Sequence, residues 1–232
     1  MKAAVVDLGT GNLASDRYRL DTPQPATPTV IADVVRALIG HHQWTQPLGA
    51  ALPAVVRHGV VESAANIDDS WISVNSDELF SDVAGLAVRT VNDADAAGLA
   101  EMRFGAGRNR HGVVMVLTFG TGIGSALFID GTLVPNTEFG HLELDGFDAE
   151  FQAAARARQR DDLSWKRWAK RVQHYLEHLE KLFSPDLFIV GGGVSRKHEQ
   201  WLPYVKIGTE TVPAEKANNA GIVGAALVAP TG

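Results

Sequence analysis

Two apolar runs separated by a glycine-rich segment constrain the fold of this chain most. Residues 113–119 and 125–129 are almost entirely apolar, and Gly-Thr-Gly-Ile-Gly stands between them at residues 120–124. Short apolar runs bounded by turn residues predict buried strands, and the glycine segment predicts that the two strands form a hairpin. Because a strand rather than a helix follows the glycines, the segment does not match the dinucleotide-binding fingerprint.

The glycine segment also has the composition of an anion-binding loop. Gly120, Gly122 and Gly124 alternate with other residues, so successive backbone N–H groups can form a concavity that accepts phosphate. Thr118 and Thr121 add two hydroxyl groups that can donate hydrogen bonds. A tight hairpin turn explains the same glycines, so the segment alone leaves both interpretations open.

The rest of the chain alternates predicted strands and helices, which is typical of an α/β fold. Strands are predicted at residues 3–7, 13–20, 47–56, 87–91 and 187–190, and helices from Pro28 and over 92–104, 151–162, 164–183 and 218–227. Val30, Val34, Val35 and Leu38 should form the apolar face of the first helix. The helix at 164–183 has a clear apolar stripe of Trp165, Trp168, Val172, Tyr175, Leu176, Leu179 and Phe183.

The composition limits the classes of partner. The net charge of the 232-residue chain is -6, which argues against a general nucleic-acid binder. No apolar run approaches the ~20 residues that span a bilayer, and no secretion signal opens the sequence, so a cytoplasmic protein without membrane partners is expected. There is no cysteine, which excludes disulfides and thiolate metal sites.

Asn92 and Asp93 stand where a predicted strand runs into a predicted helix. A carboxylate at a helix N-terminus is stabilised in its ionised form, so we expect a lowered pKa for Asp93. Such a group can act as a general base if it lies close to the hydroxyl group whose proton it accepts. Helix capping is the alternative, because Asn92 is a preferred N-cap residue and Asp95 follows three residues later.

Two further motifs are a pair of polar residues and a run of three glycines. Glu138 and His141 stand in one predicted loop, where a carboxylate and an imidazole can hold vicinal sugar hydroxyl groups. Taken alone, these residues favour the alternative of a solvated acidic loop. No metal site is predicted there, because the spacing does not bring ligands to one helical face. Gly191, Gly192 and Gly193 follow a buried strand, where a ligand can approach the backbone.

These four motifs, in this order, resemble those of the ROK sugar kinases, and most closely their polyphosphate glucokinase branch. The segments that carry the resemblance are residues 22–28, 58–61, 64–68, 91–101, 117–125, 135–146, 184–195 and 218–226. The resemblance implies an actin-like ATPase (ribonuclease H-like) fold with a small N-terminal lobe, residues 1–90, and a large C-terminal lobe, residues 91–232.

The resemblance also implies a role for each motif. Asp93 would be the catalytic base that activates the 6-hydroxyl group of glucose. The residues that would hold glucose are Asn66, Asn92, Glu138 and His141. The second phosphate loop would consist of Thr118, Gly120, Thr121, Gly122 and Gly124. Gly191, Gly192 and Gly193 would border the region that holds adenosine in ATP-using relatives.

The chain departs from the family pattern in its sugar loop and after its Gly-His pair. The wider ROK family carries a cysteine-rich zinc motif after Gly140-His141, and this chain has none, as in the polyphosphate branch. That branch has Gly-Phe-Pro-Gly in its sugar loop, where this chain has Ala51-Leu52-Pro53-Ala54. If either glycine normally takes a positive φ, alanine would be strained there and sugar binding would be weakened.

The largest departure is at the start of the sequence. The family begins with a strand and an Asp-x-Gly-Gly loop that contacts phosphate and magnesium, whereas Lys2 aligns with the end of that loop. This alignment implies that the first strand and first phosphate loop are missing. In a rival alignment, residues 7–11 (Asp-Leu-Gly-Thr-Gly) are the phosphate loop itself.

The expected function is the transfer of a phosphoryl group from inorganic polyphosphate to glucose with Mg²⁺ as the cofactor, and ATP is a second candidate donor. The resemblance allows a homodimer. The alternative is a sugar-binding protein with impaired catalysis, because the first phosphate loop is missing. A ROK repressor would need an N-terminal helix-turn-helix, for which the sequence has no room.

A long polyphosphate chain would need positive charge along its path. Lys166, Arg167, Lys170 and Arg171 recur on the polar face of the helix at 164–183 and could supply it. An ordinary solvated helix face explains these bases as well, because acidic residues follow them along the helix. The helix is therefore one hypothesis for the donor path.

Overall fold

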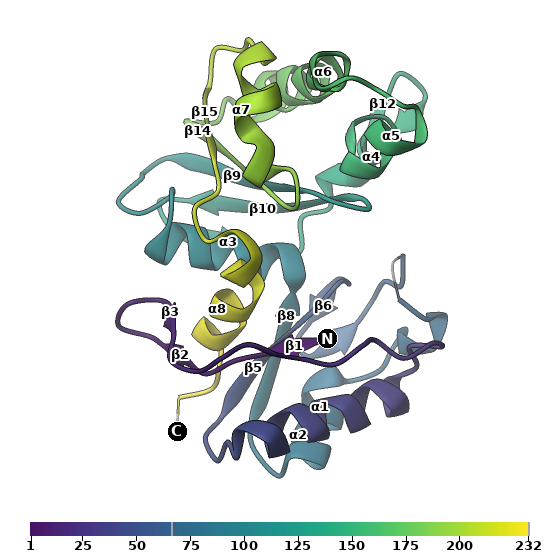
Figure 1. Ribbon diagram of the computed structural model, residues 1–232, viewed down its shortest axis with the longest axis vertical. Coiled ribbons are helices and arrows are strands. Elements are labelled where there is room, and N and C mark those ends of the chain that lie inside the picture. Colours follow the sequence, from purple (N-terminus) through teal and green to yellow (C-terminus); the bar gives the residue numbers. More distant parts are fainter. Residues whose placement is uncertain (66, 232) are drawn as a thin grey trace. The chain divides into compact units, whose positions relative to one another are not determined.

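The computed structural model of the protein describes residues 1–65 and 67–231. The chain forms two compact units. The first unit consists of Met1–Ala100 together with Asn219–Gly232, and the second unit is Glu101–Asn218. Figure 1 shows strands and helices in both, as the α/β prediction requires. No helix in the described part of the chain is long and apolar enough to cross a membrane.

The second unit contains a five-stranded sheet, whose strands are ordered β11-β10-β9-β14-β15. The strands are β9 (Val113–Phe119), β10 (Ile123–Ile129), β11 (Thr132–Val134), β14 (Leu187–Gly191) and β15 (Glu210–Pro213). Strands β9, β10 and β11 form antiparallel hairpins, and β14 lies parallel to both β9 and β15. The predicted hairpin and the predicted strand before the three glycines are both confirmed.

Helix α6 (Trp165–Phe183) packs its apolar stripe into the core of the second unit. Ser164 caps the helix by accepting a hydrogen bond from the N–H group of Arg167 at 3.3 Å. The ring of Trp168 lies edge-on to those of Phe119 and Trp201, with centroids 5.9 Å and 4.9 Å away. The predicted stripe is therefore the face that anchors this helix.

The segment predicted as one helix over residues 151–162 is two short helices, α4 (Ala149–Ala153) and α5 (Ala155–Arg160). Ala154 between them is extended, with φ -59° and ψ 159°. The indole N–H group of Trp168 donates to the carbonyl groups of Ala153 and Ala154 at 3.0 and 3.1 Å. These carbonyls therefore bind a side chain of the core, and the helix is interrupted where they do so.

Several short elements complete the second unit. They are the strands β12 (Glu143–Leu144) and β13 (Phe147–Asp148), the helix α7 (His198–Trp201), and 3₁₀ turns at Phe139–His141, Ser195–Lys197 and Leu202–Tyr204. A further 3₁₀ turn, Ala217–Asn219, crosses the boundary between the units.

The first unit begins with a long hairpin. Strand β1 (Lys2–Ala3) pairs with β4 (Tyr18–Arg19), and β2 (Val6–Asp7) pairs with β3 (Asn12–Leu13), all antiparallel. The prediction that the chain turns at residues 9–12 and returns is confirmed.

Two helices and a parallel strand pair form the core of the first unit. Helix α1 (Pro28–His42) begins after Thr27 as predicted, although Thr27 makes no side-chain capping hydrogen bond. Its buried face is Ile31, Ala32, Val35 and Leu38, so the predicted face was wrong at Val30, which is 38% exposed. The other elements are β5 (Leu48–Leu52), β6 (Val56–Arg57), β7 (Val60–Val61), a 3₁₀ turn (Asp69–Trp71), α2 (Ser76–Ala84) and β8 (Val88–Asn92), with β5 parallel to β8.

The two helices not yet described are α3 (Asp93–Phe104) and α8 (Ala220–Leu227). Helix α8 packs against β5 and α3 at backbone distance, because two glycines leave room. A Cβ atom on Gly49 would lie 1.7 Å from the carbonyl oxygen of Ala225, and one on Gly224 would lie 1.6 Å from that of Ala96. These contacts explain why residues from the end of the chain belong to the first unit.

The observed units differ from the predicted lobes in two respects. The boundary falls inside α3 rather than after residue 90, and α8 belongs to the first unit rather than to the second. The sequence places α8 far from residues 1–100, and its close contacts at Gly49 and Gly224 join it to them.

Candidate functional site

Asn92 and Asp93 form the junction between β8 and α3 in the first unit. The side-chain oxygen of the buried Asn92 accepts hydrogen bonds from the N–H groups of Ala94 and Asp95 at 2.8 and 3.1 Å, and its amide nitrogen donates to the carbonyl of Ala54 at 3.0 Å. Asn92 therefore caps the helix, as the capping interpretation predicted. Because Asn92 caps the helix, the neighbouring Asp93 carboxylate is not needed for that purpose.

The pKa of Asp93 is raised above its ordinary value, which corrects the expectation of a lowered pKa. Desolvation by surrounding protein is the main cause, and the N–H groups of Ala94 and of Asp93 itself oppose it. Water still reaches the side chain, because the residue is exposed. The helix N-terminus does favour the charged carboxylate, but the desolvation outweighs it.

The alanines of the predicted sugar loop are not strained. Neither Ala51 nor Ala54 has a positive φ. Ala51 is part of β5, and the buried Ala54 supplies the carbonyl that binds Asn92. The conditional prediction of backbone strain at these two positions therefore does not hold.

In the second unit, the glycine loop is shorter than the sequence predicted. Ile123 already pairs with Phe119, so Gly124 belongs to β10 and the turn is Gly120-Thr121-Gly122. The N–H group of Gly120 donates to the carbonyl of Gly122 at 2.9 Å. Thr118 lies on β9, where its hydroxyl group donates to the carbonyl of Gly124 at 3.5 Å.

Glu150 of α4 holds the glycine loop from outside. Its carboxylate accepts a hydrogen bond from the N–H group of Ile123 at 3.0 Å. A Cβ atom on Gly122 would lie 2.2 Å from that carboxylate, so a larger residue there would require the Glu150 side chain to move. Glu150 was not among the predicted site residues, because a glutamate in a charged helical segment has no local feature that distinguishes it from a surface residue.

Glu138 and His141 flank the 3₁₀ turn Phe139–His141. The buried hydroxyl group of Ser125 donates to the carbonyl of Thr137 at 2.7 Å and accepts from the N–H group of Phe139 at 2.9 Å, which fixes the backbone on both sides of Glu138. Gly140 packs directly on β10, since a Cβ atom there would lie 2.2 Å from the carbonyl oxygen of Ile123. The glycine loop and this turn therefore contact the same strand.

Asp148 orients His141. The Nδ1 atom of His141 lies 3.0 Å from the Asp148 carboxylate. This hydrogen bond is the main reason that the pKa of His141 is raised, and the nearby charges of Glu150 and Glu138 raise it further. Asp148, which the sequence analysis did not select, lies on a hairpin whose turn is Asp145-Gly146, with φ values of 55° and 81°. That dipeptide is a recognised hairpin motif and could have indicated the pairing.

The three glycines after β14 have different roles. Gly191 ends the strand, and a Cβ atom on it would meet Thr118 at 3.4 Å. Gly192 has φ +81°, and a Cβ atom there would lie 2.3 Å from the carbonyl oxygen of Phe119. Gly193 faces open space. Packing against β9 thus explains Gly192, whereas the adenosine-binding role of this segment stays a prediction.

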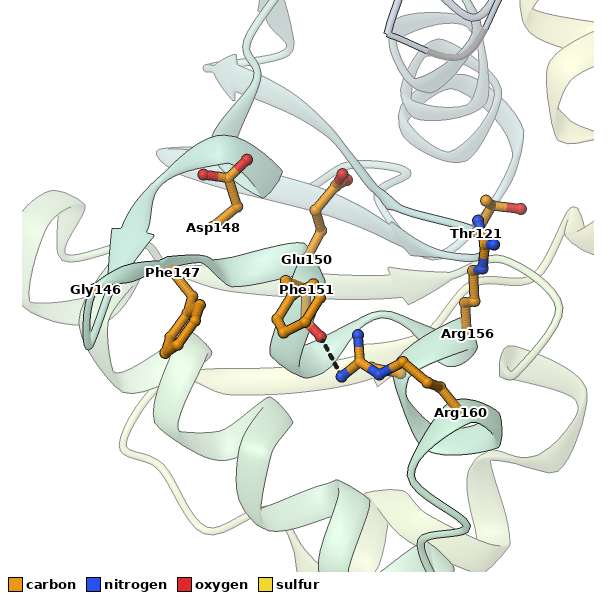
Figure 2. A pocket seen from close by; sticks show the side chains of 9 residues that line it. Thr121, Gly146, Phe147, Asp148, Glu150, Phe151, Arg156 and Arg160 are labelled. Atoms are coloured by element: carbon orange, nitrogen blue, oxygen red, sulfur yellow. Dashed lines mark hydrogen bonds between the residues drawn. The ribbon is translucent and has the colours of Figure 1, made fainter.

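A cavity of about 610 Å³ lies beside the glycine loop (Figure 2). It is lined by Thr121, Gly146, Phe147, Asp148, Glu150, Phe151, Arg156, Ala157 and Arg160. The cavity therefore borders both the predicted phosphate loop and the Asp148 side chain that holds His141. Asn66, another predicted glucose ligand, lies outside the described residues.

The resemblance to sugar kinases implies Mg²⁺ as a cofactor. The described residues contain no cluster of three or more His, Asp or Glu side chains that could hold a metal ion. Proteins usually bind Mg²⁺ through one or two carboxylates together with substrate phosphates and water. The described residues therefore do not form a metal cage of their own.

Comparisons with known proteins give the family. The model of the ROK family matches residues 1–157. The chain belongs to the ROK family. This ROK protein is 51% identical over 228 residues to the polyphosphate glucokinase of Mycobacterium tuberculosis, covering 98% of the chain and 86% of that protein. The polyphosphate glucokinase of Mycobacterium leprae is 50% identical over 228 residues, which cover 98% of the chain and 70% of that protein.

Solved structures agree with this assignment. The inorganic polyphosphate/ATP-glucomannokinase from Arthrobacter sp. strain KM is 49% identical and superposes with a TM-score of 0.93 over 97% of this chain and 92% of that one. A ROK glucokinase from Streptomyces griseus, solved with glucose and AMPPNP, is 25% identical with a TM-score of 0.82, covering 97% and 94%. The predicted actin-like sugar kinase fold is therefore confirmed.

Proposed function

We propose that this ROK protein transfers a phosphoryl group from inorganic polyphosphate, and also from ATP, to the 6-hydroxyl group of glucose. The observation that carries the proposal is the 51% identity to a polyphosphate glucokinase over 98% of the chain. The Arthrobacter relative is a polyphosphate/ATP-glucomannokinase, which supports two phosphoryl donors.

Asp93 would accept the proton of the 6-hydroxyl group as that oxygen attacks the terminal phosphorus atom of the donor. Its raised pKa suits this role, because a general base works best when its pKa approaches the operating pH. Asn92 would position the neighbouring Asp93, since its amide group caps α3 and donates a hydrogen bond to the carbonyl of Ala54.

In the second unit, Glu138 and His141 would hold glucose hydroxyl groups, with Asp148 keeping the imidazole in place. The loop Gly120-Thr121-Gly122 would bind the phosphates nearest the transferred group through backbone N–H groups and the Thr121 hydroxyl. Mg²⁺ would neutralise charge on the donor and would enter with it, because phosphate oxygens and water can supply most of its ligands.

The test of this proposal is the Asp93→Asn variant. Calorimetry should show unchanged glucose affinity, and a coupled assay of glucose 6-phosphate should show turnover lowered by about 10²–10⁴-fold with either donor. A variant that keeps more than about a tenth of the parent activity would remove Asp93 from the role of base.

The same two assays on the parent protein separate the proposal from the alternative function. Glucose binding without formation of glucose 6-phosphate from either donor would identify a sugar-binding protein with impaired catalysis. Turnover with ATP but not with polyphosphate would restrict the donor to nucleotides. Homodimer formation remains a prediction, which sedimentation of the purified chain would test.

A further inference from the structure

The cavity beside the glycine loop has a basic side that the roles above do not use. Arg156 of α5 is joined to the loop, because its backbone N–H group donates to the carbonyl of Gly120 at 3.1 Å. In Figure 2 its side chain extends toward Thr121. Within the described part of the chain, its guanidinium group has no hydrogen bond or ion pair, and neither does the Thr121 hydroxyl group. A cation and a hydroxyl donor are thus available at the same end of the cavity.

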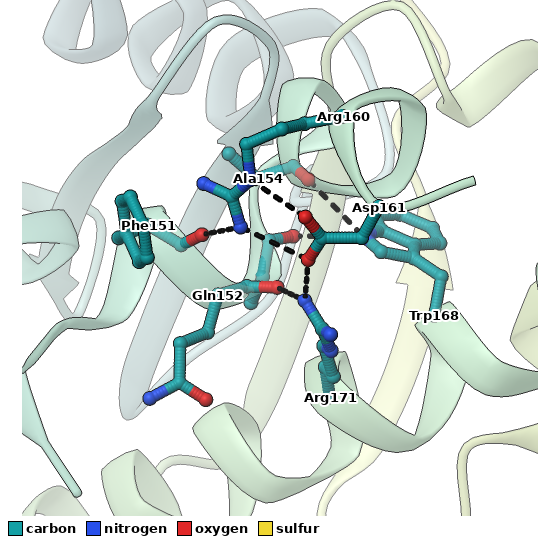
Figure 3. Close-up of polar contacts among 8 residues, drawn as sticks. Phe151, Gln152, Ala154, Arg160, Asp161, Trp168 and Arg171 are labelled. Atoms are coloured by element: carbon teal, nitrogen blue, oxygen red, sulfur yellow. Dashed lines mark hydrogen bonds and ion pairs between the residues drawn. The ribbon is translucent and has the colours of Figure 1, made fainter. Parts of the chain in front are cut away.

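Arg160 extends the basic side along α5. Its guanidinium group lies 4.0 Å above the ring of Phe151 and donates to the carbonyl of that residue at 2.9 Å. Figure 3 shows that the carboxylate of Asp161 accepts hydrogen bonds from both Arg160 and Arg171, at 2.7 and 2.6 Å. One carboxylate faces two guanidinium groups, and they hold its pKa well below the ordinary value. This trio therefore keeps a net positive charge, and Arg160 has a fixed orientation.

Both acidic residues of the cavity are engaged in hydrogen bonds, Asp148 at the end away from Arg156 and Glu150 beside the glycine loop. Asp148 is bonded to His141, and Glu150 is bonded to the N–H group of Ile123. In Figure 2 Asp148 lies on the opposite side of the cavity from Arg156. The arginines Arg156 and Arg160 thus form a basic side of the cavity, while the carboxylates of Asp148 and Glu150 are bound to groups of the protein.

We propose that the basic side of this cavity binds the polyphosphate chain beyond the phosphoryl group that is transferred, with Arg156 and Arg160 as phosphate ligands. The inference rests on the proposed function and adds the location of the donor's tail. Guanidinium groups suit this ligand because their planar donors match pairs of phosphate oxygens. A chain of repeating phosphates needs such cations at intervals and needs no pocket for a base.

This location replaces the path along α6 that the sequence suggested. Arg171, one of the four bases on that path, is bound to Asp161 and to the carbonyl of Gln152 at 3.2 Å. Arg167 is exposed on the same helix and lacks a side-chain partner among the described residues. It therefore offers a matched control, because its replacement removes one positive charge from the same unit away from the cavity.

The test compares Arg156→Gln with Arg167→Gln. Titration calorimetry with long-chain polyphosphate should show about tenfold weaker binding to the Arg156 variant, with a smaller dependence on salt, and parent-like binding to the Arg167 variant. In the coupled assay, the ratio of KM for polyphosphate to KM for ATP should rise by a similar factor in the Arg156 variant. Arg156→Lys, which keeps the charge without the planar donors, should fall between Gln and the parent. Thermal unfolding checks that each variant is folded.

Each other outcome decides against the proposal. Equal losses in the two Gln variants would favour α6 as the path. Equal changes in KM for both donors would mean that the cavity holds phosphates shared by polyphosphate and ATP. Parent-like polyphosphate binding by Arg156→Gln would overturn this inference alone, whereas a parent protein that uses ATP but does not bind polyphosphate would overturn the donor assignment as well.

Discussion

The chain contains the tripeptide Gly-Thr-Gly twice, at residues 9–11 and at 120–122, and the two copies have different surroundings. In the first copy, the Asp7 carboxylate accepts hydrogen bonds from the N–H group of Gly9 and the hydroxyl group of Thr10, both at 2.8 Å. The donors of this loop are therefore satisfied inside the loop. It closes the hairpin between β2 and β3 and has no group left over that points to a ligand.

The second copy is held from outside. Glu150 supports it through Ile123, Arg156 binds its first carbonyl, and the Thr121 hydroxyl group lines the cavity. The tripeptide therefore does not decide the function of a loop. What decides it is whether an acidic side chain within the loop uses the donors or leaves them to a ligand.

The largest expected effect comes from matched alanine substitutions in the two loops. In Gly122→Ala the new Cβ atom would displace the Glu150 carboxylate and shift the loop, so turnover should fall by about 10- to 100-fold. In Gly9→Ala the nearest atom is the Asp7 carboxylate at 3.2 Å, and turnover should stay within about twofold of the parent. Steady-state kinetics with both donors measures this difference.

These two variants also test the rival alignment. Comparable losses of turnover in Gly9→Ala and Gly122→Ala would contradict this distinction between the loops, because they would mean that residues 7–11 bind phosphate themselves. Unfolding curves should accompany the kinetics, since a loss of folded protein would imitate a loss of turnover.

A second, smaller effect concerns the pH dependence of stability. The Thr10 hydroxyl and the Gly9 N–H group hold the pKa of Asp7 below its ordinary value, whereas desolvation raises that of Asp93. Asp7 therefore stabilises the fold above its unfolded pKa of about 3.9, and this contribution is lost as the pH falls through the folded value. Ionised Asp93 destabilises the fold, and this cost disappears as the pH falls below its folded value.

The two Asn variants should therefore change the stability of the protein in opposite directions. At neutral pH Asp7→Asn should unfold at a lower denaturant concentration than the parent and Asp93→Asn at a higher one. Both differences should shrink below pH 4. Chemical denaturation from about pH 3 to 7 measures the three proteins. A destabilised Asp93→Asn at neutral pH would contradict the raised pKa of Asp93.

The smallest effect should be confined to one imidazole. Asp148→Asn removes the carboxylate that raises the pKa of His141, so that pKa should fall and the protonated form should disappear at a lower pH. An NMR titration of the histidine rings measures the shift directly. His174, which contacts Asp145 at 2.9 Å, serves as the internal reference. An unchanged His141 titration would show that Asp148 does not hold it in solution.

Much of the fold could be predicted because its long elements have one-sided or continuous apolar patterns. Strands β9 and β14 are almost entirely apolar, and α6 has a single stripe. The break between α4 and α5 could not be predicted, because it depends on the indole group of Trp168, which approaches from a different helix. The position of α8 depends likewise on distant backbone contacts at Gly49 and Gly224.

The candidate site could be predicted where a motif is contiguous in sequence. Asn92-Asp93 and the loop at 120–122 are of this kind. Glu150 could not be recognised, because its contact with Ile123 joins two elements whose approach no local pattern encodes. The pKa of Asp93 was predicted in the wrong direction, because the sequence shows the helix terminus but not the protein that surrounds it.

The contact between α8 and its neighbours has a consequence for how the protein is made. The core of the first unit needs residues from both ends of the chain, with the whole second unit in between. During synthesis, residues 1–100 emerge long before α8 does, and until then β5 and the backbone of α3 near Ala96 lack the helix that covers them. Residues 101–218, which are continuous, can fold first as a unit. The junction that presents Asp93 would thus be completed among the last steps, after translation of Ala220–Leu227.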